Sequence, residues 1–253
     1  MKLHQGVLLF LVALYLLGLL GADQVIVSTA YLEAPNTRYW LGTNELGQSV
    51  ALLLWQALPN SLSIAFFSGV LPVLWAMLLA TFAYLLPRWF DQLLLKCVDI
   101  LLILPGTLLL LLFAAWMEPN LWGSILLVAA VSWMDDFRVL RLSLIKAATR
   151  DHLMVARSFG ATPLYLIRKH LWPSLHTLLF ALWLQNARRG LLLTAGLAFL
   201  GLIDPRQTHW GGMLFAAQPY IDSPAFWWLM LPPAMALTGL IFLLALLQPR
   251  ESI

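Results

Sequence analysis

The sequence predicts an all-α integral membrane protein with about six transmembrane helices. Of its 253 residues, 61% are hydrophobic and 11% are charged, whereas soluble domains are roughly a quarter charged. The apolar residues come in blocks rather than in alternating or helical stripes. Lipid and neighbouring helices are therefore expected to surround most of the chain, and spanning segments in lipid must pair their own backbone groups.

Six blocks are long or nearly long enough to cross a bilayer, which takes about 20 residues of helix. We expect spans at about residues 6–27, 60–86, 93–116, 121–137, 175–203 and 226–247. Pro72 and Pro105 fall inside blocks and predict kinks. The first block also has the pattern of a signal peptide, because Lys2 precedes an apolar run that ends near Gly21 and Ala22. We favour a retained span, since the charge distribution fits it.

The positions of Lys and Arg predict that both termini are cytoplasmic. With six spans and a cytoplasmic N-terminus, Arg38 and Arg206 fall outside and ten basic residues fall inside. The inside set is Lys2, Arg88, Arg138, Arg141, Lys146, Arg150, Arg157, Arg168, Lys169 and Arg250. This excess follows the positive-inside rule. The sequence contains no evident linker or repeat, so residues 1–253 are expected to form a single transmembrane domain.

Residues 151–173 form a compact charged segment between two apolar blocks. Asp151 and Thr162 are good N-cap residues, and Gly160 suits the left-handed position that ends a helix. Pro163 suits the first turn of the next helix. We therefore predict two short helices joined by a tight turn on the cytoplasmic side.

The spacing of this segment leaves two interpretations open. Its basic residues and small apolar face fit an amphipathic helix that lies on lipid headgroups. The same short helix could instead dock into a groove of a soluble partner. A DNA-binding helix-turn-helix is excluded, because membrane segments on both sides leave no free recognition helix.

A resemblance favours the docking interpretation. In "VARSFGATPLYLIRKHLWPS", Ala156, Gly160, Leu171 and Pro173 match the second alanine, the glycine, the isoleucine and the proline of the EAA loop of ABC-transporter permeases. Met154 and Val155 stand where that loop has its glutamate and first alanine, so the loop is divergent.

Three further segments resemble one branch of these permeases, in the same order along the chain. They are "LGTNELGQSV" at 41–50, "VDILLILPG" at 98–106 and "LAFLGLIDPRQTHWGGML" at 197–214. The chain thus resembles the second, shorter permease subunit of dipeptide, oligopeptide and nickel importers. The resemblance implies a type I ABC importer permease-like fold, a place in the bacterial cytoplasmic (inner) membrane, and import of peptides, nickel or a metal–chelator complex.

The resemblance also implies the partners and the coupling site. The partners are two ABC ATPase subunits, a second homologous permease, an extracytoplasmic substrate-binding protein and membrane lipid, with no nucleic acid. Residues 151–173 would be the coupling loop, in which Leu153 and Phe159 fill a groove of the ATPase, Arg157 sits at its rim and Gly160 sets the bend. The full set expected to couple is Leu153, Ala156, Arg157, Phe159, Gly160, Ala161 and Pro173.

The chain is not expected to be an enzyme. It contains no Walker G-x-x-x-x-G-K-[ST] sequence, so ATP and Mg²⁺ would be bound by partner ATPase subunits and no cofactor by this chain. Its histidines show no metal-ligand spacing; they are His4, His152, His170, His176 and His209. A non-transporting membrane assembly or structural protein with a lipid-facing basic loop remains the alternative function.

Arg188 and Arg189 lie near the middle of the fifth predicted span, where each costs about 2.5–3.5 kcal/mol on insertion scales. In one interpretation the helix has a small kink at Asn186 and Gly190, and carboxylates of a partner permease, or Asp135 and Asp136, neutralise both arginines. In another, Arg188, Arg189 and Asn186 line the translocation path and attract an anionic substrate group. A shifted span would place both arginines at an interface.

Other charged and aromatic residues have simpler predicted roles. Asp135 and Asp136 are expected to pair with the nearby Arg138 and Arg141, and Asp99 with its local neighbour Lys96. An aromatic belt is expected at the outer span ends, formed by Trp40, Trp116, Trp122, Trp210, Trp227 and Trp228. By analogy, the loop at Trp210 is a candidate contact for the binding protein.

Overall fold

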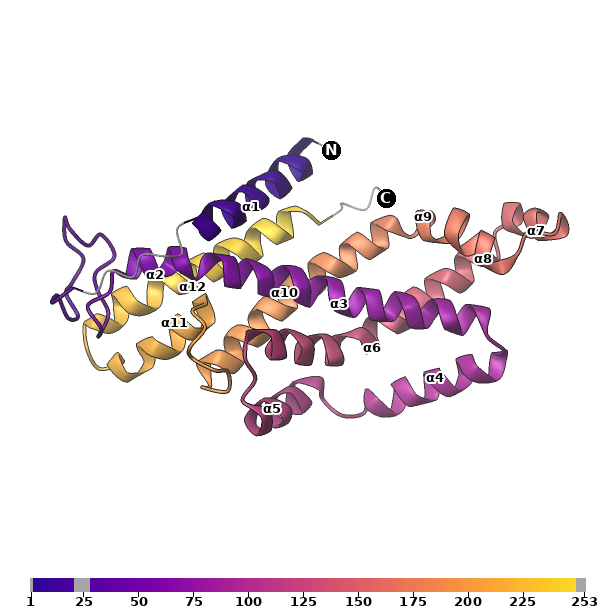
Figure 1. Cartoon of the computed structure of the whole chain (residues 1–253). Coiled ribbons are helices and arrows are strands. Elements are labelled where there is room, and N and C mark those ends of the chain that lie inside the picture. The colour runs from indigo at the N-terminus through magenta and orange to yellow at the C-terminus, as the bar shows by residue number, and fades with distance from the viewer. Residues whose placement is uncertain (1, 21–27, 249–253) are drawn as a thin grey trace.

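The structure is a computed structural model that describes residues 2–20 and 28–248, and it is helical (Figure 1). In this described part, the strand-like pairing is one isolated antiparallel bridge between Thr43 and Ser49. The predicted all-α class is therefore confirmed for the described residues. The final residues of the first predicted span, 21–27, lie outside them.

The helices follow the predicted blocks closely, with short additional helices between them. They are α1 (Lys2–Leu20), α2 (Val50–Gln56), α3 (Leu58–Leu85), α4 (Arg88–Leu101), α5 (Gly106–Met117), α6 (Leu121–Ala148), α7 (Asp151–Ser158), α8 (Pro163–Leu166), the π-helix η1 (Ile167–Leu171), α9 (Trp172–Ser174), α10 (His176–Phe199), α11 (Trp210–Ala217), the 3₁₀-helix η2 (Gln218–Tyr220) and α12 (Ala225–Leu246).

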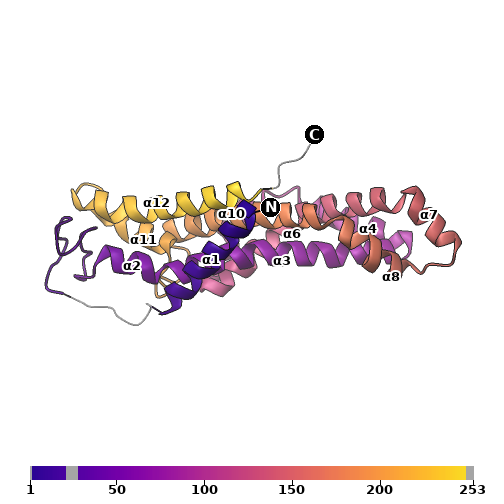
Figure 2. The same cartoon turned by 90° about the horizontal axis from the view of Figure 1, so that it is seen from above.

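The molecule is an elongated bundle in which α3, α6 and α10 pack together along the middle (Figures 1 and 2). The helices α7 and α8 lie at one end, and α2, α11 and residues 28–49 lie at the other. Small residues let α3 and α10 approach closely, because Gly190 lies against Ser68 and Gly69 lies against Trp183. Among the fully buried side chains of the described residues, the largest is Phe137 of α6.

The six-span count remains a prediction. In the described part of the chain, two helical segments are long and apolar enough to cross a membrane, Val50–Leu85 and Ala225–Leu246. The bent pair of α4 and α5 makes a third if it counts as one span. The helices α6 and α10 carry charged residues in their central turns, which lowers their mean hydropathy.

Two predicted blocks differ from the helices that form. The block 93–116 is not one helix, because α4 and α5 meet at an angle of 75°. Pro105 starts α5 and cannot continue the hydrogen-bond ladder of α4, so the kink predicted there becomes a break. Pro72, by contrast, lies within α3, which continues past it.

The helix at the predicted span 121–137 is longer than the span. The helix α6 continues to Ala148, because Asp135 and Asp136 do not terminate it. Each of these carboxylates instead has a partner on α10. These two charged residues therefore mark a contact between α6 and α10.

Candidate functional site

The predicted turn between the two short helices forms as expected. Gly160 has a φ of +83°, and the N–H of Ala161 donates to the carbonyl oxygen of Ala156 at 3.1 Å. This is the Schellman arrangement, which favours glycine at the left-handed position. The side chain of Thr162 then accepts a hydrogen bond from the N–H of Tyr165, with Pro163 in the first turn of α8.

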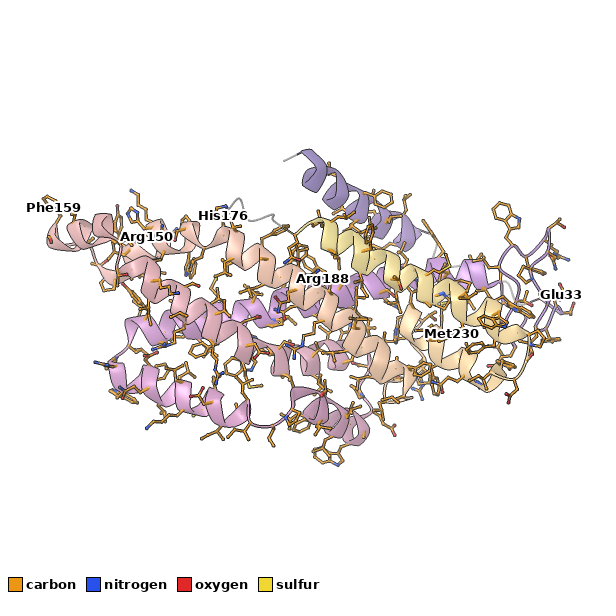
Figure 3. All side chains as sticks on the ribbon, turned by 180° about the vertical axis from the view of Figure 1, so that it is seen from behind. Glu33, Arg150, Phe159, His176, Arg188 and Met230 are labelled. Carbon is orange, nitrogen blue, oxygen red and sulfur yellow. The ribbon has the colours of Figure 1, made fainter. Side chains whose placement is uncertain are left out.

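The two apolar residues expected to fill a partner's groove lie in opposite environments. Phe159 is 86% exposed, and Figure 3 shows it at the far tip of the molecule, at the end opposite to Glu33. Leu153 is only 2% exposed and belongs to the core cluster of the same chain. The prediction that Leu153 enters a partner's groove was therefore wrong, because Leu153 is already covered by its own bundle.

The remaining predicted coupling residues take intermediate positions. Ala156 and Ala161 are partly buried and pack against the core cluster. Pro173 is exposed, and the π-helix η1 precedes it, with the N–H of Trp172 donating to the carbonyl oxygen of Ile167. A wide turn of this kind adjusts the hydrogen-bond ladder before a residue that lacks an N–H. The side chain of Arg157 lies outside the described residues.

Four polar side chains join α6 to α10 in two adjacent contacts. The amide nitrogen of Asn186 donates to the carboxylate of Asp136 at 2.5 Å, and both side chains are buried. One turn further along α10, Arg189 pairs with Asp135 at 3.1 Å, and both of these side chains are partly exposed. The interpretation in which Asp135 neutralises Arg189 thus agrees with the structure.

Arg188 has a different neighbourhood. Its guanidinium donates to the side-chain oxygen of Gln248 at 3.0 Å and to the carbonyl oxygen of Leu184 at 3.3 Å. Figure 3 shows Arg188 in the middle of the molecule's length. The structure therefore separates the two adjacent arginines: Arg189 faces a carboxylate of α6, and Arg188 faces neutral groups at the end of α12 and on its own helix.

The ion pairs of the fourth block were predicted with the wrong partners. Arg138 pairs with Asp99, and Arg141 pairs with Asp91, so both arginines of α6 reach across to α4. The guanidinium of Arg141 donates two hydrogen bonds to the carboxylate of Asp91. This hydrogen bonding raises the pKa of Arg141 above its ordinary value.

At the end of the molecule opposite to α7, hydrogen bonds between neutral groups hold the motif at residues 41–50 in place. In the motif at 41–50, the side-chain nitrogen of Asn44 donates to the side-chain oxygen of Gln48 at 2.9 Å. The indole nitrogen of Trp228 donates to the carbonyl oxygen of Thr43 at 3.2 Å. The first bond lies within the motif, and the second joins the motif to α12.

Trp210 is not a surface residue. It is buried, and its indole nitrogen donates to the carbonyl oxygen of Leu54 at 3.0 Å. Trp210 therefore fastens this loop to α2, and the contact predicted between the loop and a binding protein stays a prediction. His209 is also buried and caps α11 by accepting from the N–H of Gly212, and burial lowers the pKa of His209 to about 4. The sequence pattern did not predict that His209 would cap a helix.

Known proteins place the chain in a family. The family described as "Binding-protein-dependent transport system inner membrane component" matches residues 72–250, which is more than half of the chain. The chain belongs to this family. It is therefore a permease subunit of an ABC importer and not a catalytic subunit, and the ATPase is a separate polypeptide.

Relatives of this permease cover most of its length. A protein of Brucella suis biovar 1 whose name calls it a peptide permease protein is 31% identical over 91% of this chain and 76% of its own. The di/tripeptide transport system permease protein DppC of Pseudomonas aeruginosa is 30% identical over 89% of this chain and 72% of its own.

A solved structure supports the fold of the permease. Inward-facing conformations of the MetNI methionine ABC transporter contain a chain that aligns with a TM-score of 0.59 at 18% identity. The alignment covers 78% of this chain and 91% of that one. The type I ABC importer permease-like fold that the sequence predicted is thus supported for the overall arrangement of helices.

Proposed function

We propose that this permease subunit translocates peptides across the bacterial cytoplasmic membrane in an ATP-driven importer. The names of the Brucella and Pseudomonas relatives both refer to peptides, which supports this substrate class. The importer would also contain a second homologous permease, two ATPase subunits that bind ATP and Mg²⁺, and an extracytoplasmic binding protein. Nickel and metal–chelator complexes, which the sequence resemblance also implied, stay an untested prediction.

The exposed ring of Phe159 carries the proposal for coupling. A phenyl ring at the tip of a segment that is predicted to face the cytoplasm exposes apolar surface to water, and burying that surface against a partner would be favourable. A groove on an ATPase subunit would bury the ring, as a helix docks into an apolar groove. Gly160 follows directly and turns the chain back toward the bundle.

The buried side of α7 would make this segment a lever. Leu153 holds α7 to the core cluster, and the backbone N–H of Leu153 donates to the carbonyl oxygen of Arg150 just after α6 ends. Movement of Phe159 would therefore be passed to α6 rather than absorbed by a loose loop. Packed helices have discrete arrangements, so a shift at one end changes the arrangement along the bundle.

We place the translocation path along the face that Arg189 and Asp135 share. Both side chains are partly exposed, and exposed charges at the depth of a bilayer are expected to face water or protein rather than lipid. Arg188 would flank this face. Asn186 is buried behind it, so we assign it the positioning of α10 against α6 rather than contact with substrate.

The test is the Phe159→Asp variant in the complete importer. We expect normal insertion and assembly of the permeases, together with loss of peptide-stimulated ATP hydrolysis and of peptide uptake, because a carboxylate disfavours an apolar groove. Phe159→Leu is the matched control, since it keeps an apolar group at the tip, and it should retain most of both activities. Full peptide uptake by Phe159→Asp would refute the coupling role.

A further inference from the structure

Four charged side chains from three helices form two ion pairs, and the two pairs share helix α6. We define the charged row as Asp99 of α4, Arg138 and Asp135 of α6, and Arg189 of α10. Arg138 pairs with Asp99, and Arg189 pairs with Asp135. Since Arg138 follows Asp135 by three positions on a helix, the two pairs are neighbours, and the signs alternate along the row.

The charged row is open to its surroundings. Its four side chains are between 36% and 57% exposed, whereas Asp136 and Asn186 directly behind it are 3% exposed. The buried hydrogen bond between Asp136 and Asn186 fixes the register of α6 against α10, so that Asp135 and Arg189 meet on the surface. The row is thus a positioned feature and not a chance encounter of long side chains.

Lipid is a poor neighbour for the charged row. Each charge costs about 2.5–3.5 kcal/mol at the centre of a bilayer on insertion scales, and such residues face water-filled cavities or other helices. Asp99, Asp135 and Arg189 all lie inside predicted spans. The surface that carries them is therefore expected to face a polar space within the assembled importer.

We propose that the Arg189–Asp135 pair is a transient binding site for free peptides with both termini ionised, an assignment that rests on the proposed function. The pair is single-bonded, through one guanidinium nitrogen and one carboxylate oxygen. A peptide carboxylate can bind Arg189 while its ammonium group binds Asp135, so the pair opens without leaving either charge unpaired. The second pair, Arg138–Asp99, presents the same two charges one step further along.

A solute with one charge lacks this advantage. An anion that binds Arg189 releases Asp135, and a cation that binds Asp135 releases Arg189. Each of these exchanges leaves one charge of the pair without its partner, and breaking a charge-assisted hydrogen bond without replacing it costs free energy. The alternating row therefore favours a zwitterion over an acylated or an amidated peptide.

Arg188 does not compete in this exchange. Its guanidinium is held by the neutral oxygens of Gln248 and Leu184 and not by a carboxylate of the charged row. The row therefore has as many acidic as basic groups, which is the balance that a zwitterion matches.

The experiment measures uptake by the complete importer in proteoliposomes, with its ATPases, second permease and binding protein. The probes are trialanine, N-acetyl-trialanine and trialanine amide. We expect Arg189→Gln to reduce the preference for trialanine over its amide by roughly tenfold, the size of one lost charge-assisted hydrogen bond. We expect Asp135→Asn to reduce the preference over the N-acetyl peptide by a similar factor.

The binding protein is the same in every sample, so its own selectivity cancels when variants are compared with the parent. Arg206→Gln is the matched control, because Arg206 forms an exposed ion pair with Asp204 away from the charged row. Its preference ratios should equal those of the parent.

Three results would overturn the proposal in distinguishable ways. If the parent importer takes up trialanine and both ratios are unchanged in Arg189→Gln and Asp135→Asn, the zwitterion site is refuted while peptide import stands. If the two variants fail to assemble with the second permease, the charged row is a subunit interface. If the parent importer takes up none of the three probes, peptide import itself is refuted together with the site.

Discussion

The amide of Asn186 in α10 donates a hydrogen bond to the carboxylate of Asp136 in α6, deep inside the bundle and 50 residues away in the chain. Neither side chain has more than a few per cent of its surface exposed. A buried carboxylate has lost its hydrogen bonds to water, so its burial costs free energy unless other groups of the protein donate hydrogen bonds to it. This contact is therefore a fixed point between the two helices, and the Arg189–Asp135 pair beside it depends on the same register.

We predict that Asn186→Leu destabilises the permease by roughly 2–3 kcal/mol, since it leaves the buried carboxylate of Asp136 without its donor. The double variant Asp136→Leu with Asn186→Leu should be closer to the parent, because no polar group is then left unpaired. Denaturant unfolding in detergent measures both. A double variant less stable than Asn186→Leu alone would contradict this account.

The two glycines of α10 should respond in opposite ways to alanine. A methyl group at Gly190 would collide with Ser68 of α3, so Gly190→Ala is expected to separate the helices and to lower the melting temperature in detergent. Gly196 lies in the same helix with nothing within 4 Å of an added methyl group. Gly196→Ala should therefore be neutral or stabilising by up to about 1 kcal/mol, from helix propensity alone. Equal effects of the two changes would refute the close approach of α3 and α10.

Because His209 is a buried N-cap, we predict that the free energy of unfolding decreases in acid. His209 lies between the predicted spans 175–203 and 226–247, and burial lowers its pKa from 6.5 to about 4. Between these two values the unfolded chain binds a proton that the folded chain does not. The contribution of the neutral cap is therefore complete above about pH 6.5 and declines as the pH falls toward 4, by at most roughly 3 kcal/mol.

His209→Asn separates this effect from other titrations. Asparagine can accept the hydrogen bond from the N–H of Gly212 that His209 accepts now, and it does not titrate. Thermal unfolding between pH 4 and 7 should show a smaller loss of stability for the variant than for the parent. Parallel pH profiles of the two proteins would contradict the assignment.

Local chemistry explains which parts of the structure were predictable. The turn at Gly160 and the N-cap at Thr162 follow from backbone preferences of single residues, and both form. The same kind of preference predicted a kink at Pro105, where the structure has a complete break between two helices. The apolar blocks likewise mark where helices lie, because any lipid-facing segment must satisfy its own backbone.

Contacts between helices were less accessible from the sequence. Arg138 and Arg141 have carboxylates two to six residues away on their own helix, yet they pair with Asp99 and Asp91 of α4. Local sequence patterns also do not determine which side of a short helix packs against the bundle. Leu153 and Phe159 both belong to the small apolar face, but the packing of α7 buries the first and exposes the second. The opposite charges of Asp135 and Arg138 can be seen in the sequence. Only the packing of α10 against α6 shows that Arg189 lies beside Asp135.

Gly160 allows the lever to be tested through backbone conformation alone. Its φ is +83°, and an added methyl group would meet nothing within 4 Å, so substitutions act through strain and not through collision. Asparagine tolerates the left-handed region better than other residues with side chains, whereas proline holds φ near −65°. In the complete importer, Gly160→Asn should retain peptide-stimulated ATP hydrolysis and Gly160→Pro should lose it, with both variants inserted to similar levels. If Gly160→Pro transports as well as Gly160→Asn, the bend is not part of the connection between Phe159 and the bundle, and α7 moves independently of α6.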